Sequence, residues 1–327
     1  MIPAWATYGG VVSTRLSKLL RCEVPIQLSP MGSVSVTAAL PLAVAAAGGH
    51  AVYPGLGLPP AALAPVIDAL ASRTSAFGVN LLVQMLDRDS LELVASRAPY
   101  VDFFLADAEP ELVSRVHEGG AVCGWQVESA DEARAAEAAG CDVVIAKAWE
   151  SGGRKRIEGP TLIPLLDAVL DAVAIPVIAA GGIASPRGVA AAFAAGADGV
   201  RVGTRFIASA ESEAHPQWVQ AVLGASASDA VVSNAFNVGL PTPGPHRVLR
   251  SSIAAAESFE GDETGIVRLA GADIPVARFG AVPPTRDSTG TIAAMPFYAG
   301  QSAGAVTRIQ PAAEIFAELA TGVPRTS

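Results

Sequence analysis

The chain has 327 residues, of which 51% are hydrophobic and 16% are charged, and its formal net charge is −9. This composition is typical of a well-packed globular protein whose apolar burial offsets chain entropy without disulfides or metals. The acidic balance argues against nucleic acid or an anionic membrane as the main partner.

The first two thirds of the chain alternates Val- and Ile-rich runs with Ala-rich helical runs. We expect strands at residues 24–28, 50–53, 77–83, 101–106, 121–126, 142–146, 176–180 and 199–203. We expect the intervening helices at residues 36–47, 60–71, 90–97, 109–118, 129–139, 161–173 and 186–195. Eight such repeats predict parallel strands covered by helices, which close most simply into a (β/α)8 TIM barrel of the α/β class. A doubly wound open sheet is the alternative, but no GxGxxG motif follows the first strand.

The pattern changes after Phe206. Residues 211–224 are expected to be helical, and residues 225–289 are rich in Pro and Gly, with hairpin-like runs at 265–269 and 274–279. A helical pattern at residues 303–319 would close the barrel as its eighth helix. These features predict a barrel formed by residues 1–206 and 290–327, with residues 207–289 inserted after strand 8 as a small lid-like subdomain.

Three cysteines, Cys22, Cys123 and Cys141, lie far from any CxxC spacing, so buried reduced thiols are expected rather than a disulfide framework or a zinc site. The chain has no charged segment followed by a signal-like apolar region, and no apolar run reaches the roughly 18 residues that span a bilayer. We therefore expect a cytoplasmic protein with no membrane partner.

Two glycine-bearing turns give the sharpest local signal. Segment 180–182 (Ala-Gly-Gly) ends the seventh expected strand, and segment 203–205 (Gly-Thr-Arg) ends the eighth. Glycine lets the backbone approach an anion closely, and free N–H groups at the start of a helix bind phosphate. Barrels often hold phosphate in the loops after strands 7 and 8, where Arg205 would add charge if it faced inward. FMN, a sugar phosphate and a nucleotide all fit this signal.

At these turns the chain resembles the nitronate monooxygenase family, formerly called 2-nitropropane dioxygenases. This FMN-dependent barrel family also includes flavin enoyl-acyl-carrier-protein reductases and quinone reductases. The segments that carry the resemblance are 25–32, 47–49, 77–81, 179–183, 203–206 and 298–304. The resemblance implies that FMN is held by Pro30, Met31, Gly32, Asn80, Gln126, Lys147, Ser151, Gly152, Gly153, Ala180, Gly181, Gly182, Gly203, Thr204 and Gln301.

The sequence departs from the family in the loop after strand 6. The family typically has Glu-Ala-Gly-Gly-His there, and its His is the catalytic base or a substrate contact. Residues 150–156 instead read Glu-Ser-Gly-Gly-Arg-Lys-Arg, so Arg154 stands at the His position. A guanidinium stays protonated and cannot accept a proton at neutral pH. We expect Arg154 to hold an anionic group of the substrate beside the flavin, with Lys147, Glu150 and Tyr298 as the other catalytic candidates.

Several further basic residues have simpler interpretations. For Lys155 and Arg156, a solvated loop with no role is the alternative to a part in the site. His246 would reach the mouth of the barrel only if the insertion folded over it. A solvated surface is the simpler explanation for Arg247, Arg250 and Arg278, which an acidic substrate tail could otherwise contact.

The expected activity is that of an FMN-dependent oxidoreductase of the nitronate monooxygenase type, which oxidises a small anionic substrate with O2. One alternative is an NAD(P)H-dependent flavin reductase that acts on an enoyl thioester or a quinone. Another is a non-redox barrel that binds a phosphorylated ligand. The sequence leaves open whether NAD(P)H is a partner and whether the chain forms a homodimer.

Overall fold

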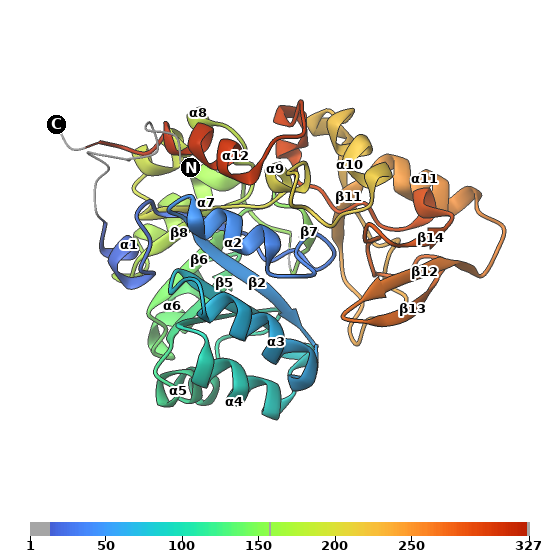
Figure 1. The fold of residues 1–327 in the computed structure, drawn as a ribbon. Helices are drawn as coiled ribbons and strands as arrows, with labels where there is room; N and C mark the ends of the chain where they lie inside the picture. Colours follow the sequence, from blue (N-terminus) through green and yellow to red (C-terminus); the bar gives the residue numbers. More distant parts are fainter. Residues whose placement is uncertain (1–13, 157, 326–327) are drawn as a thin grey trace.

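The computed structural model describes residues 14–156 and 158–325, and its centre is a closed barrel of eight parallel strands. The barrel order is β1-β2-β3-β4-β5-β6-β8-β9, and β9 pairs with β1 to close it. Figure 1 labels β2, β5, β6 and β8 among these strands. The strands are β1 Ile26–Leu28, β2 His50–Leu56, β3 Phe77–Leu82, β4 Tyr100–Phe104, β5 Val122–Val127, β6 Val143–Lys147, β8 Val177–Ala180 and β9 Gly199–Val202. The predicted TIM barrel is therefore confirmed.

Helices cover the outside of the barrel. After the short α1 (Arg15–Leu19), they are α2 Ala39–Ala46, α3 Pro60–Ala71, α4 Arg88–Arg97, α5 Pro110–Glu118, α6 Ala130–Ala138, α7 Leu162–Leu170, α8 Pro186–Ala194 and α12 Ala312–Ala320. Side-chain caps from Asp87, Ser129 and Ser185 start α4, α6 and α8 by accepting otherwise unpaired N–H groups. Helix α12 packs against α2 and α8, so it closes the ring as the eighth helix.

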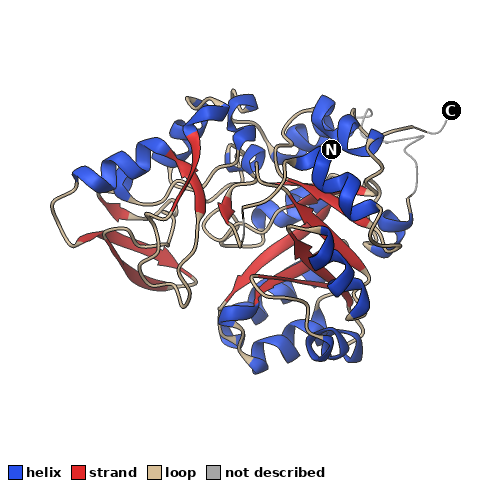
Figure 2. Cartoon of the chain, turned by 180° about the vertical axis from the view of Figure 1, so that it is seen from behind, coloured by secondary structure: helices blue, strands red, loops and turns tan. Residues whose placement is uncertain are grey.

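The segment between β9 and α12 projects to one side of the barrel. It contains α9 Thr204–Ile207, α10 Pro216–Leu223, β10 Ala230–Ser233, β11 His246–Leu249, α11 Arg250–Ser258, β12 Glu263–Leu269, β13 Ala272–Ala277 and β14 Thr289–Gly290. Figures 1 and 2 show the β12–β13 hairpin and α11 away from α3 to α6. The expected hairpin is confirmed, whereas the domain boundaries at 206/207 and 289/290 stay a prediction.

The insertion is joined to the barrel through the loop after β6. Within that loop β7 (Gly153–Arg154) pairs antiparallel with β11, so that His246 lies opposite Arg154 and Arg247 opposite Gly153. Strands β10, β11 and β7 thereby form a three-stranded sheet. This sheet brings the insertion to the carboxyl end of β6, where the sequence predicted only a loop.

Three expectations about helices are wrong in part. The helix expected at 211–224 begins only at Pro216, because His215 caps its N-terminus. The helix expected at 303–319 is divided into a 3-10 turn, Gln301–Ala305, and α12, because Pro311 cannot continue a helix and instead precedes α12 as its cap residue. Helix α11 lies in the Pro- and Gly-rich region where no helix was expected. Within the described residues, no helix is long and apolar enough to cross a membrane.

Candidate active site

A cavity of about 510 Å³ opens at the carboxyl ends of the barrel strands. It collects nearly all of the residues expected to contact cofactor or substrate: Pro30, Met31, Gly32, Asn80, Gln126, Lys147, Ser151, Gly152, Gly153, Arg154, Ala180, Gly181, Gly182, Gly203, Thr204 and Tyr298. Glu150 and Gln301 are not among its lining residues. The volume is in the range typical of cofactor and small-molecule sites.

The two glycine turns form an anion cradle on one side of this cavity. They follow neighbouring parallel strands, β8 and β9, so they lie at the same end of the barrel. Gly181 and Gly182 have φ of 108° and 74°, which favour glycine. Among the described residues, no acceptor takes the N–H groups of Gly182, Gly203 and Thr204. Unpaired amides that converge in this way suit a phosphate.

Glu150 shapes the loop after β6 instead of reaching into the cavity. Its carboxylate Oε1 accepts the N–H of Leu162 at 3.0 Å, and its main-chain carbonyl accepts the N–H of Gln301 at 3.0 Å. A Cβ on Gly152 would lie 2.7 Å from the carbonyl carbon of Ala299, so the loop can approach segment 298–304 only with glycine there. The contacts of Glu150 and Gln301 therefore suggest that both position the loop, and they do not support the direct roles expected of them.

Lys147 is held at the end of β6 by the protein itself. Its Nζ donates to Glu128 Oε1 at 2.9 Å and to the carbonyl of Arg154, and it lies 4.5 Å from the centre of the Phe104 ring. Burial alone would raise the pKa of Glu128, but the charge and hydrogen bond of Lys147 hold that pKa below its ordinary value. Lys147 therefore fixes the start of the loop and presents a positive charge to the cavity.

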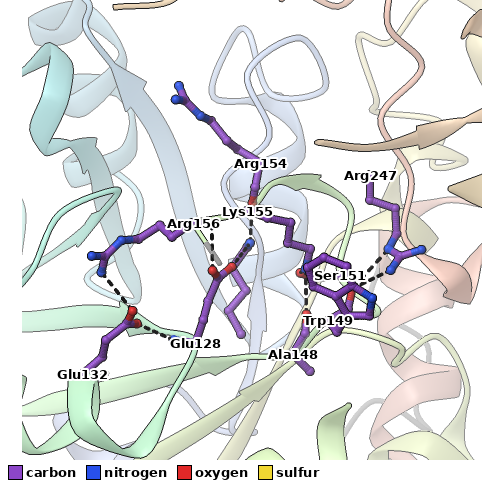
Figure 3. Close-up of polar contacts among 10 residues, drawn as sticks. Glu128, Glu132, Ala148, Trp149, Ser151, Arg154, Lys155, Arg156 and Arg247 are labelled. Atoms are coloured by element: carbon purple, nitrogen blue, oxygen red, sulfur yellow. Dashed lines mark hydrogen bonds and ion pairs between the residues drawn. The ribbon is translucent and has the colours of Figure 1, made fainter. Parts of the chain in front are cut away.

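The structure does not support the alternative that Lys155 and Arg156 lie in a solvated loop. Lys155 is only 2% exposed, and its Nζ donates to the carbonyl of Ala148 at 2.8 Å and to Ser151 Oγ (Figure 3). Burial, followed by the charge of Lys147, lowers the pKa of Lys155 to about 5. Because the amine is neutral, it can remain buried. Its two hydrogen bonds tie the ends of the loop together.

Arg156 forms ion pairs with Asp107 at 2.6 Å and with Glu132 at 3.2 Å. Its main-chain N–H donates to Glu128 Oε2 at 2.8 Å. These contacts anchor the loop at its far end, so the cationic run at residues 154–156 is built into the rim of the barrel. Figure 3 shows the Arg154 side chain pointing away from the cluster around Glu128, unlike its two neighbours.

Arg154 and His246 lie side by side at the mouth of the cavity. Arg154 Nη2 donates to the carbonyl of Thr242 in the insertion, and its Nε is buried without a partner among the described residues. The His246 ring stacks on that of Tyr298, with centroids 5.5 Å apart, and both residues line the cavity. The Tyr298 hydroxyl donates to the carbonyl of Ala281 at 2.9 Å, and burial raises its pKa. The insertion thus brings an imidazole to the loop position where the family motif has its own histidine.

The hydrogen bonds of Asn237 define the tautomer of His246. The Asn237 amide is oriented by two contacts, since Oδ1 accepts the N–H of Gly244 at 2.8 Å and Nδ2 donates to the carbonyl of Asn234 at 2.9 Å. The same Oδ1 lies 3.3 Å from His246 Nε2, which must therefore carry the hydrogen. Nδ1 has no hydrogen-bond partner within the described part of the chain and is left as an acceptor.

The electrostatic surroundings keep His246 neutral. The side chain is buried, and burial together with the charges of Arg154 and Lys147 lowers its pKa to about 4. A neutral imidazole with a free Nδ1 lone pair can accept a proton at pH 7. His246 is therefore the best-placed proton acceptor at the mouth, and the structure meets the condition that the sequence left open, namely that the insertion folds over the barrel.

Three other arginines considered as ligand contacts serve the protein's own structure. Arg205 faces away from the glycine turns and contacts Gln310 and Glu318. Arg247 donates to the carbonyls of Trp149 at 2.9 Å and Ala230 at 2.6 Å, and Arg278 donates to the carbonyls of Ala256 at 2.8 Å and Glu257 at 2.9 Å. None of the three lines the cavity, so the structure does not support the ligand contacts considered for them, and Arg247 is buried rather than part of a solvated surface. Arg250 remains exposed.

Sequence reasoning missed two parts of the site. One is Arg201 of β9, which lines the cavity although it is only 3% exposed. The other is an apolar wall that the insertion contributes, formed by Val238, Leu240, Leu269, Ile274, Val282 and Pro283. The sequence carried no signal for this wall, because its members come from three separate turns and strands.

Comparison with known proteins agrees with this geometry. The model of the nitronate monooxygenase family matches residues 69–322. The chain is 36% identical over 245 residues to (3aS,4S,5R,7aS)-5-hydroxy-7a-methyl-1-oxo-octahydro-1H-indene-4-carboxyl-CoA dehydrogenase of Mycobacterium tuberculosis, which covers 73% of this chain and 67% of that protein. It is 33% identical over 176 residues to a probable nitronate monooxygenase of Staphylococcus saprophyticus, covering 51% of this chain and 49% of that protein.

Comparison with solved structures also finds enzymes of this kind. FabK from Thermotoga maritima superposes with a TM-score of 0.76 and 33% identity, covering 95% of this chain and 96% of that one. Nitroalkane oxidase from Streptomyces ansochromogenes superposes with a TM-score of 0.74 and 25% identity, covering 94% of this chain and 98% of that one. The chain therefore belongs to the nitronate monooxygenase family of flavin-dependent oxidoreductases.

Proposed function

We propose that this oxidoreductase uses FMN and acts on the acyl group of a bulky, largely apolar thioester. The observation that carries the proposal is the apolar wall of the cavity, formed by Val238, Leu240, Leu269, Ile274, Val282 and Pro283. Such a wall gains free energy by covering a hydrocarbon group, whereas a small nitronate would leave most of it uncovered. The names of the Mycobacterium tuberculosis and Rhodococcus jostii relatives, both carboxyl-CoA dehydrogenases, support the same substrate class.

The residues at the strand ends fit FMN. The unpaired N–H groups of Gly182, Gly203 and Thr204 suit its phosphate, and the amide side chains of Asn80 and Gln126 lie at the cavity floor, where a flavin ring needs polar partners. FMN, when bound, accepts or gives up a hydride equivalent. The protein supplies its placement and keeps water from the reacting carbons.

The corner formed by Arg154, His246 and Tyr298 acts on the substrate. In the oxidative direction Nδ1 of His246 accepts the proton from the carbon next to the thioester carbonyl, while a hydride leaves the neighbouring carbon. The guanidinium of Arg154 stabilises the negative charge that develops on the carbonyl oxygen. Reduction of an enoyl thioester with NAD(P)H as reductant would use the same groups in reverse.

Nitronate oxidation with O2 is the second candidate. The family match and the nitroalkane oxidase neighbour favour it, and a nitronate anion would be attracted to Arg154. In that reaction His246 has no proton to remove from a preformed nitronate. The apolar wall would then contribute little to binding.

Anaerobic stopped-flow mixing of the FMN-loaded protein separates the candidates. We expect cyclohexanecarboxyl-CoA to bleach the flavin absorbance, and cyclohexenecarboxyl-CoA to reoxidise enzyme that has been reduced with dithionite. Bleaching by the anion of 2-nitropropane alone would favour the second candidate and contradict the first. A purified protein that is colourless and binds no added FMN would contradict both.

A further inference from the structure

A buried charged cluster crosses the barrel interior beneath the cavity. Arg201 of β9 donates from Nε to Gln27 Oε1 at 2.6 Å and from Nη2 to the carboxylate of Asp102 on β4. Asn80 also donates to Asp102, and Gln27 contacts His50 Nδ1 at 2.9 Å. Arg201 and Asp102 are 3% and 0% exposed, so their charges are shielded from water.

This ion pair is oriented with its positive end towards the cavity. Arg201 lines the cavity, whereas Asp102 is not among the lining residues. Arg201 Nη1 is buried and has no hydrogen-bond partner among the described residues. An unsatisfied buried donor is costly, and a charged donor more so, unless a ligand completes it. Arg201 therefore presents its charge at the floor of the cavity, where a bound ligand would meet it.

The position of Arg201 indicates which ligand group would be the acceptor. Arg201 lies on β9, two residues before Gly203, which follows that strand in the phosphate cradle, and Asn80 and Gln126 line the same cavity. A flavin ring has carbonyl oxygens on its pyrimidine part and gains negative charge there when it is reduced. A fixed cation near that part of the ring tunes the electronics of the flavin.

We propose that Arg201, which lines the floor of the cavity, contacts the pyrimidine part of the bound flavin and stabilises the negative charge that the ring gains on reduction. Asp102 holds the guanidinium in place and partly offsets its charge from the far side. This inference rests on FMN binding at the cavity. It concerns how easily the bound flavin is reduced, whatever the substrate.

Sulfite provides a test that needs no substrate. Sulfite adds to flavin N5 by forming a sulfur–nitrogen bond with its own electron pair, and the displaced pair of electrons places negative charge on the pyrimidine part of the ring. We expect the charge-neutral double variant Arg201→Gln/Asp102→Asn to retain FMN and to bind sulfite at least about tenfold more weakly than the wild type, since one charged hydrogen bond contributes about 1.5–3 kcal/mol. The single variant Asp102→Asn keeps the cation without its partner and should bind sulfite more tightly.

Arg205 offers a matched control. It is also a buried arginine with an unpartnered Nη1, but it contacts Gln310 and Glu318 and does not line the cavity. The variant Arg205→Gln/Glu318→Gln should bind sulfite as the wild type does. Unchanged sulfite affinity in Arg201→Gln/Asp102→Asn would overturn the inference and leave the proposed function standing. If that double variant does not fold, unchanged sulfite affinity in Asp102→Asn overturns the inference equally. A wild-type protein that binds no FMN would overturn the proposed function itself.

Discussion

The barrel side and the insertion side of the cavity hold their charges in opposite ways. At the strand ends each cation has a carboxylate partner, Arg201 with Asp102 and Lys147 with Glu128. At the mouth, Arg154 contacts a main-chain carbonyl and His246 an amide oxygen, and neither has a carboxylate partner among the described residues. The balanced side suits a cofactor ring that must be bound in two redox states. The unbalanced side is suited to a substrate that develops negative charge.

The largest expected effect tests the barrel side at its phosphate cradle. Gly181 has φ of 108°, and a Cβ there would lie 3.1 Å from the main-chain nitrogen of Ser151. Gly181→Ala should move the turn and misdirect its N–H groups. The loss of two hydrogen bonds to a charged group, each contributing about 1.5–3 kcal/mol, weakens FMN binding by about 1000-fold. Fluorescence titration of the apoprotein with FMN measures this change.

Gly196 provides the control for backbone strain alone. It has φ of 103°, and a Cβ there would lie 3.1 Å from Leu170 Cδ1, but it precedes β9 and so lies at the opposite end of the barrel. Gly196→Ala should leave FMN affinity unchanged. Equal loss of FMN affinity in both variants would mean that the turn at Gly181 has no special part in binding the cofactor.

A smaller effect is expected when the proton acceptor on the insertion side is removed. His246→Gln should lower turnover of cyclohexanecarboxyl-CoA by about 100-fold, within the range typical of a lost general base. Because a base acts only when unprotonated, wild-type turnover should fall as the pH drops towards about 4, the pKa of His246. The variant should lack this acid limb in a steady-state pH profile. Full turnover in His246→Gln would remove His246 from the mechanism, and His117→Gln, on the exposed surface, is the control.

The same histidine should also affect stability in acid. Its native pKa of about 4 lies below the ordinary value of 6.5, so the unfolded chain takes up the proton first as the pH falls. The stability that the neutral His246 contributes is complete above pH 6.5 and is lost progressively as the pH falls towards 4. Linkage gives a loss of about 2 kcal/mol between pH 7 and pH 5, which His246→Gln should abolish.

His50 extends this comparison to the barrel interior. Burial, followed by the charge of Arg201, lowers its pKa to about 3, so His50→Gln should flatten the acid dependence of stability in the same way. Urea unfolding at pH 7 and pH 5 measures both effects. An acid loss that persists in both variants would show that other groups control the acid stability.

The two sides of the cavity also differ in how far the sequence predicts them. The glycine turns at 180–182 and 203–204 were predictable because a βα turn is a local feature, and eight repeats fix where each strand ends. The pairing of His246 with Arg154 was not, because it depends on the register of β11 against β7, which are distant in the sequence. Arg201 could not be identified as a cavity residue either, because the alternation of side chains along a strand does not show which inward-facing ones reach a cavity. Helix α11 could not be predicted from a capping residue, since Leu249, which precedes it, has no side chain that can cap the helix.

The smallest expected effect tests the apolar wall that separates the two candidate substrates. Ile274 and Leu240 line the cavity, so Ile274→Ala and Leu240→Ala should each raise KM for cyclohexanecarboxyl-CoA by about tenfold, the effect expected from lost contacts in an apolar pocket. Ile266, on the same hairpin as Ile274 but 38% exposed and outside the cavity lining, is the matched control. FMN affinity and the reaction with the 2-nitropropane anion should not change in any of the three variants. If Ile274→Ala slowed the nitronate reaction as much as the thioester reaction, the wall would be part of a general scaffold, and the insertion would lose its role in substrate choice.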